Sequence, residues 1–177
     1  MSKLGIKRAV TSVALVTDLE LLNEYDRAVE ELEKLQKNAR ADRMTGDPEL
    51  RKAGKAVQDL EKQMDESTVL VKLRALKRTR WAELEEKHPA RDDNDLDKQY
   101  GVNVDTFFED VLPECIVEVT EKHTGKKIAF DPATEWAPLS EEMSDGQYAR
   151  FITSALALNR GAADVPFSRI ASVVTRD

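Results

Sequence analysis

The sequence is poor in cysteine and in aromatic residues. Its 177 residues include a single cysteine, Cys115, so no disulfide can form within the chain. A lone cysteine is typical of proteins from a reducing compartment, and the cytoplasm is the default expectation. Aromatic residues make up 6% of the chain, so Leu, Val and Ala in packed helices have to supply most of the buried surface. The length favours one domain, with room for a helical appendage.

Long hydrophobic runs and a basic charge balance are also missing. No apolar stretch approaches the roughly 20 residues of a membrane-spanning helix, and the stretch RAVTSVALVTD (8–18) is interrupted by Thr, Ser and Asp. We therefore expect neither membrane association nor an N-terminal export signal. Asp and Glu total 34 against 27 Lys and Arg, which gives a net charge of -7. Phosphate repels such a chain, so nucleic acid is not expected as the main partner.

Catalytic and metal-binding signatures are absent as well. The sequence contains no GxSxG, GxxxxGK, GxGxxG or HExxH pattern, which removes the common hydrolase, P-loop, dinucleotide-binding and zinc-protease motifs. His88, His123 and Cys115 lack the CxxC or HxxxH spacing of a zinc site, and we expect structural roles for them. Carboxylate pairs are abundant in so acidic a chain and carry little weight as acid–base candidates. We predict no enzymatic activity, no catalytic residues, no metal and no cofactor.

The first 75 residues have the pattern of two strands around two amphipathic helices. The stretch 9–16 is rich in β-branched residues, and Asp18 follows it as a helix N-cap. A second helix begins at Pro48 after Asp47, and a strand-like stretch over 67–75 follows that helix. We expect a β-α-α-β unit whose helices pack antiparallel as a coiled-coil-like arm, while parallel or antiparallel pairing of the two strands stays open. Heptad-spaced stripes support it: Leu22, Tyr25, Val29, Leu32 and Ala39 in the first helix, and Leu50, Ala53, Val57, Leu60 and Met64 in the second.

Residues 76–161 have the pattern of a compact helical body. Trp81 and Leu84 form the buried face of a first short helix, and Asp105 or Thr106 caps a second one. The last helix has a broad apolar face and Gly161 as its C-cap. The expected helices cover 77–88, begin within 102–112, and cover 145–159.

Prolines and polar stretches separate these helices. Pro89 stops the first helix, and Pro113 ends or kinks the second. The stretches 89–101 and 124–140 have the composition of loops. The sequence therefore predicts a mainly α fold with a small β element, divided into an arm over 1–75, a helical body over 76–161 and an apolar tail over 162–177.

Two surface features are candidates for binding. The most basic window contains Lys72, Arg74, Lys77, Arg78 and Arg80, next to Trp81. A nucleic-acid site is one interpretation, but alternation with apolar residues and the acidic residues that follow favour a solvated face. The tail residues Phe167, Ile170, Val173 and Val174 either pack back on the body or recruit a partner protein, and we take them as partner-binding candidates.

Three blocks of the sequence resemble a known family. They are VLVKLRALKRTRWAELEEKHPARDDND (69–95), GVNVDTFFEDVLPECIVE (101–118) and ALALNRGAADVPFSRIASVVTRD (155–177). In this order they resemble the small tail assembly chaperones encoded near the tape-measure gene in siphoviruses and prophages of actinobacteria. The residues that carry the resemblance are Leu76, Trp81, Leu84, His88, Pro89, Asn103, Thr106, Phe107, Phe108, Leu158, Asn159, Pro166, Phe167 and Ser168.

The resemblance implies a protein-binding role without catalysis. A member of this family binds the long, hydrophobic, coiled-coil-prone tape-measure protein in the host cytoplasm and keeps it soluble until tail-tube subunits polymerise around it. It is absent from the finished virion. We count the tail-tube subunit and other copies of the chain as further candidate partners, and the sequence leaves the oligomeric state open. The alternative from another class is a structural virion component, such as a head-tail connector or a minor tail protein.

Overall fold

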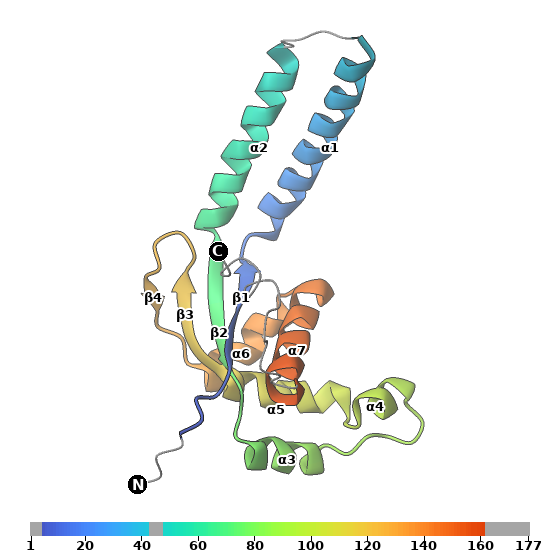
Figure 1. Cartoon of the computed structure of the whole chain (residues 1–177), viewed down its shortest axis with the longest axis vertical. Helices are drawn as coiled ribbons and strands as arrows, with labels where there is room; N and C mark the ends of the chain where they lie inside the picture. Colours follow the sequence, from blue (N-terminus) through green and yellow to red (C-terminus); the bar gives the residue numbers. More distant parts are fainter. Residues whose placement is uncertain (1–4, 43–47, 162–177) are drawn as a thin grey trace, which may run out of the picture.

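A four-stranded antiparallel sheet forms the centre of the molecule (Figure 1). The computed structural model describes residues 5–42 and 48–161. Neighbouring strands pair antiparallel throughout, in the order β1-β2-β3-β4. The strands are β1 (Val10–Val16), β2 (Thr68–Arg74), β3 (Ile116–Glu121) and β4 (Lys127–Ile128).

The sheet confirms the coarse expectation of a mainly helical chain with a small β element, and it is larger than expected. The first two strands pair antiparallel, from Val10 opposite Arg74 to Val16 opposite Thr68, which decides the orientation that the sequence left open. The segment 76–161, expected to be helical, contributes β3 and β4. Because β3 pairs with β2, the sheet connects residues on both sides of position 75.

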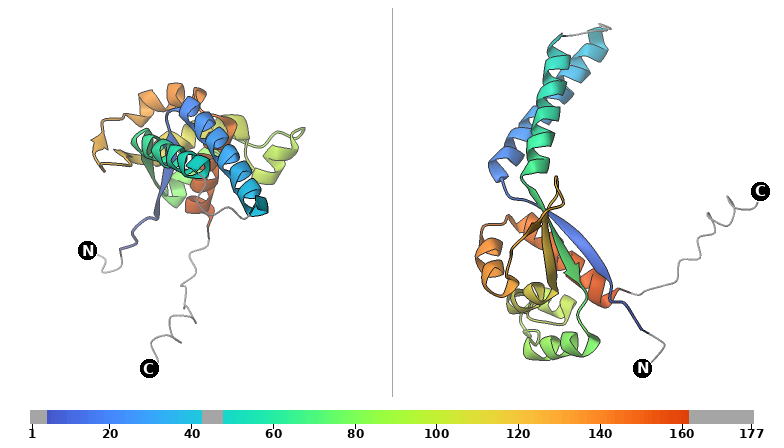
Figure 2. Two further views of the ribbon diagram at one scale, coloured as in Figure 1. Left: turned by 90° about the horizontal axis from the view of Figure 1, so that it is seen from above. Right: turned by 90° about the vertical axis from the view of Figure 1, so that its left-hand side faces the viewer.

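Helices α1 (Leu19–Asp42) and α2 (Pro48–Glu66) lie side by side and project beyond the end of the sheet (Figures 1 and 2). Asp18 caps α1, since its side chain accepts a hydrogen bond from the backbone N–H of Leu21 at 3.0 Å. Leu21 and Val57 are buried, whereas Tyr25, Val29 and the rest of the described stripe are half-buried. Two helices that cover each other on one side only leave apolar surface accessible along the arm.

The remaining helices pack on one face of the sheet and at its lower end (Figures 1 and 2). Helix α7 lies against β1 and β2, and α5 contacts α3, α4, α6 and α7. At the centre, Phe107 meets Trp81 and Phe108 edge to face, each pair with ring centroids 5.1 Å apart. The helices are α3 (Arg78–Lys87), α4 (Asp95–Tyr100), α5 (Val104–Cys115), α6 (Pro132–Glu141) and α7 (Asp145–Arg160).

Several local expectations are corrected. The stretch 89–101, expected to be a loop, contains α4, and the stretch 124–140 contains β4 and α6. Helix α5 is capped by Asn103, whose side chain accepts from the N–H of Asp105 at 3.1 Å, and the expected cap at Asp105 or Thr106 is wrong. Pro113 lies inside α5, which continues to Cys115. The buried positions Trp81 and Leu84 of α3 are confirmed.

Candidate protein-binding site

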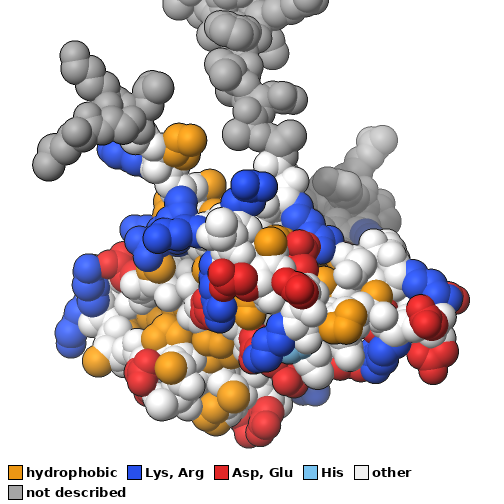
Figure 3. Space-filling model, turned by 90° about the horizontal axis from the view of Figure 1, so that it is seen from below, with side chains coloured by type: hydrophobic (Ala, Val, Ile, Leu, Met, Phe, Trp, Pro, Cys, Tyr) orange, Lys and Arg blue, Asp and Glu red, His pale blue; other side chains and the backbone are white. Residues whose placement is uncertain are grey.

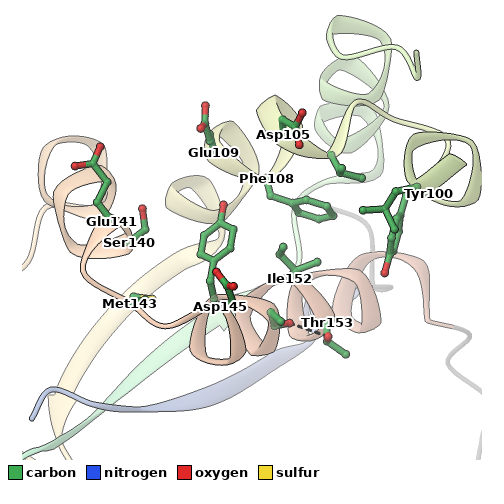
Figure 4. A pocket seen from close by; sticks show the side chains of 14 residues that line it. Tyr100, Asp105, Phe108, Glu109, Ser140, Glu141, Met143, Asp145, Ile152 and Thr153 are labelled. Carbon is green, nitrogen blue, oxygen red and sulfur yellow. Dashed lines mark hydrogen bonds between the residues drawn. The ribbon is translucent and has the colours of Figure 1, made fainter. Parts of the chain in front are cut away.

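A groove of about 520 Å³ lies between α5 and α7, with α4 and α6 at its ends; we call it the α5–α7 groove (Figure 4). Figure 4 shows Phe108 of α5 and Ile152 of α7 pointing toward each other, with Tyr100 of α4 at one end. The lining residues are Leu96, Tyr100, Val104, Asp105, Phe108, Glu109, Ser140, Glu141, Met143, Asp145, Tyr148, Ala149, Ile152 and Thr153.

Apolar side chains form the floor of the α5–α7 groove. The rings of Tyr100 and Phe108 meet edge to face, with centroids 6.3 Å apart. Leu96 is 52% exposed at the rim, a large apolar side chain left in contact with solvent on a six-residue helix. An exposed apolar surface with a polar margin is typical of a site for another protein.

A buried carboxylate connects α4 to the start of α5 at one end of the groove. Asp97 is fully buried, and its oxygens accept hydrogen bonds from Arg91 Nε at 2.7 Å and from the backbone N–H of Val104 at 3.1 Å. These hydrogen bonds, led by the one from the Arg91 side chain, hold the pKa of Asp97 well below its usual range. Asn94 caps α4, and Gly101 ends it with a φ of 74°, a conformation that favours glycine.

Four carboxylates surround the apolar floor. Asp105, Glu109, Glu141 and Asp145 line the groove, and its lining includes no Lys or Arg. Arg91 neutralises Asp105 at 2.8 Å, but no ion pair among the described residues involves the other three. A rim with this charge attracts a cationic partner and repels an anionic one.

Tyr148 lies partly shielded from solvent in the lining of the groove. Its side chain is half-buried beside Trp136, whose ring stacks on it at a centroid distance of 6.5 Å. Burial raises the pKa of the Tyr148 hydroxyl, and the charge of Glu109 raises it further. Because the Tyr148 side chain is half-buried, water is partly excluded around it, which favours apolar contacts with a partner.

A hydroxyl, an imidazole and a carboxylate meet between α3 and α5. His88 Nδ1 lies 2.7 Å from Thr106 Oγ1, and His88 Nε2 lies 3.0 Å from Asp110 Oδ2. A nucleophilic triad has the same order of groups, but none of these three residues lines the α5–α7 groove or three further grooves of the described chain. Asp110 also pairs with Lys87. The cluster joins the end of α3 to α5, which agrees with the structural role expected for His88.

The basic residues between positions 72 and 80 either pair with nearby carboxylates or are exposed to solvent. Lys72 pairs with Glu118 at 3.5 Å, and Arg80 pairs with Glu83 and Glu114 at 3.0 and 2.6 Å. Arg74, Lys77 and Arg78 are exposed. Figure 3 shows the molecule from below, where blue side chains gather beside the described start of the chain and both charge signs alternate elsewhere. The solvated-face interpretation agrees with this arrangement.

The other predicted sites have simple outcomes. The partner-binding candidates Phe167, Ile170, Val173 and Val174 lie outside the described residues. Within residues 5–42 and 48–161, no group of three or more His, Cys, Asp or Glu side chains is placed to hold a metal ion. No helix in the same ranges is long and apolar enough to cross a membrane. His123 lies 3.5 Å from Asp65, far along the chain from His88.

The α5–α7 groove was missed from the sequence because its lining comes from four helices, two of which were expected to be loops. One signal was available: Asp131 before Pro132 has the same cap-and-proline pattern as Asp47 before Pro48.

Comparison of the chain with family models, with curated proteins and with solved structures found no match in any of the three.

Proposed function

We propose that this chain is a tail assembly chaperone of a siphovirus or prophage, a non-enzymatic protein that binds the tape-measure protein. The ordered sequence blocks around Trp81, Phe107 and Asn159 motivate the family. The observation that carries a protein-binding role is the α5–α7 groove, an open apolar floor with four carboxylates and no cation in its lining.

In this proposal the groove receives one amphipathic helix of the tape-measure protein. Leu96, Tyr100 and Ile152 contact the apolar face of that helix, and Glu109, Glu141 and Asp145 face Lys or Arg residues at its margins. The partly exposed stripe of α1 and α2 offers a second contact surface for a coiled-coil-forming client. The net charge of -7 keeps the complex soluble.

The proposal includes a place of action. The chaperone works in the host cytoplasm, holds the client until tail-tube subunits polymerise, and is absent from the mature virion. We expect the coiled-coil-like helical hairpin within residues 1–75 to hold the client until the tail-tube subunits replace it.

Co-expression tests the proposal. The full chain is produced together with the tape-measure protein of the same phage, and the soluble fraction of the client and its co-purification are measured. We expect both to exceed the values obtained with an unrelated acidic protein of similar size. Equal values for the two proteins would sink the proposal.

Mass spectrometry of purified particles separates the chaperone from a structural virion component. A chaperone is recovered at far below stoichiometric amounts, whereas a head-tail connector or a minor tail protein is recovered at its full copy number. Full recovery would replace the chaperone proposal with the structural one.

A further inference from the structure

The two edges of the sheet are protected to very different degrees. The edge strand β4 is two residues long, and its Lys127 pairs with Glu118. The opposite edge, β1, is seven residues long and reads VTSVALV, without a charged residue or a proline. Short strands, charges and prolines are the devices by which proteins prevent further strands from adding at an edge. β1 has none of them.

The direction of the backbone groups of β1 follows from two hydrogen bonds at its ends. Ala9 C=O accepts from Ala75 N–H, and Thr17 N–H donates to Ser67 C=O, both at 2.9 Å. The register between β1 and β2 has no shift, so every odd-numbered residue between these ends turns its N–H and C=O toward β2. Val10, Ser12, Ala14 and Val16 therefore turn theirs to the outer side. Val16 C=O accepts from Gln147 Nε2 at 2.8 Å, in agreement with this assignment.

A second groove runs along this edge. It has a volume of about 410 Å³ and lies between β1 and α7. On the α7 side it is lined mainly by small residues, with Gly146, Ala149 and Thr153 spaced by three and four positions along one face. Arg150 is the charged residue in its lining and is exposed. Small side chains at this spacing allow another helix to approach closely.

We propose that β1 is the interface between two copies of this chain, which pair their β1 strands antiparallel about a twofold axis at Val13. This interface goes beyond the client site, because it uses the sheet edge instead of the α5–α7 groove. In this register Val10 lies opposite Val16 of the second copy and Ser12 opposite Ala14. The Val16 C=O already accepts from Gln147 Nε2. The other outward N–H and C=O groups of both strands find partners across the axis, and one continuous sheet forms.

Charge favours a second copy as the occupant. A chain with a net charge of -7 repels itself, yet neither β1 nor the groove beside it contributes a carboxylate. The α5–α7 groove, with four carboxylates, is unsuited to a second acidic copy. One strand pair is small compared with the roughly 1,200–2,000 Å² of a stable interface. The twofold axis adds contact by bringing the small-residue faces of the two α7 helices toward each other.

The pairing has a geometric consequence for the arms. Helix α1 follows the Val16 end of β1, and antiparallel pairing places the two Val16 ends at opposite sides of the dimer. The two α1–α2 arms then project in opposite directions from one continuous sheet.

Charged substitutions at Ser12 and Ala14 test the register. Both side chains are exposed on the outer face of the sheet, so changing them leaves the core intact. Ser12→Lys with Ala14→Lys places like charges opposite each other twice across the axis, and we expect the dimer dissociation constant to rise roughly 30-fold. Ser12→Lys with Ala14→Glu places opposite charges there and is expected to retain the dimer.

Sedimentation equilibrium of the full chain gives the readout. The unmodified chain is expected at twice the 20.0 kDa of one copy at micromolar concentration. Circular dichroism of both double variants serves as the folding control. If the unmodified chain sediments with the mass of one copy, the proposal is overturned. The alternative occupants of the β1 edge are then a strand of another protein or residues 162–177. Equal dissociation constants for the two double variants overturn it as well.

Discussion

Asp97 connects α4, at one end of the α5–α7 groove, to the start of α5. It is buried, and its carboxylate accepts hydrogen bonds from the Arg91 side chain and from the backbone N–H of Val104. Nothing in the sequence DDNDLD distinguishes it from Asp92, Asp93 or Asp95, which are exposed. A run of similar acidic residues gives no signal for the one that is buried, because the distinction arises from the position of Arg91.

The substitution Asp97→Asn is expected to lower the stability of the chain at neutral pH. The folded-state pKa of Asp97 lies below its ordinary value of 3.8, so its contribution to stability is present above that value and is lost as the pH falls below it. Urea unfolding at pH 7 and at pH 3 measures the difference from the unmodified chain. We expect this difference to shrink at pH 3.

Asp95→Asn is the matched control for this measurement. Its carboxylate is exposed and only pairs with Lys98 at 3.4 Å, so the stability should change little at either pH. An equal loss of stability for the two variants would contradict the role given to Asp97.

Cys115 is a second residue with a measurable environment. Burial raises the pKa of its thiol to about 11, from an ordinary value of 9.0. At pH 8 the thiolate fraction is then about a hundredfold smaller than for an ordinary thiol. We expect Ellman's reagent to react with the folded chain at least that much more slowly than with the chain in denaturant. Comparable rates in both states would show that the end of α5 is accessible.

The elements differ in how well the sequence predicts them, for physical reasons. The long helices α1, α2 and α7 and the strands β1 and β2 have extended periodic patterns, and they were predicted. Strand β3 was missed because the register shifts beside Leu73, so Ile116 and Val119 are both buried and simple alternation is lost. Helix α6 was missed because Pro132 and Pro138 read as loop residues, whereas Pro132 occupies the first turn, where proline is favourable.

We expect the N-cap of α5 to contribute to the stability of the chain. Asn103→Ala removes the side-chain acceptor for the N–H of Asp105 and is expected to cost about 1 kcal/mol of unfolding free energy. Asn103→Asp keeps an acceptor at the same position and should restore most of the stability. Chemical denaturation of the two variants gives the comparison, and equal losses would mean that the cap contributes nothing.

The whole molecule has three surfaces with different chemistry. The α5–α7 groove is apolar with an acidic rim, the β1 edge is uncharged, and the α1–α2 arm has a half-buried stripe between charged faces. In the proposals made above, a client, a second copy and a coiled-coil segment each bind at a different one of these surfaces. Helix α7 contributes Ala149 and Thr153 to both grooves, so the client site and the proposed dimer interface are neighbours.

Salt dependence is the expected property of the proposed client site. In the proposal, the carboxylates of Glu109, Glu141 and Asp145 attract a cationic helix, and salt screens such solvent-exposed charges. Client affinity should therefore fall as the ionic strength rises from low to physiological values and then level off where apolar contacts dominate. An affinity that rises from the lowest salt concentration onward would contradict a cationic client.

The affinity of groove variants for the tape-measure protein tests the proposed binding site in the α5–α7 groove. Leu96→Asp with Glu141→Lys changes the rim and the exposed edge of the α5–α7 groove. Ile6→Asp with Glu86→Lys makes the same chemical changes at exposed positions outside it. The chain is titrated calorimetrically with the segment of the tape-measure protein that co-purifies with it. We expect binding to be about tenfold weaker for the groove variant and unchanged for the control. Equal affinities for the groove variant and the unmodified chain would contradict client binding in the α5–α7 groove.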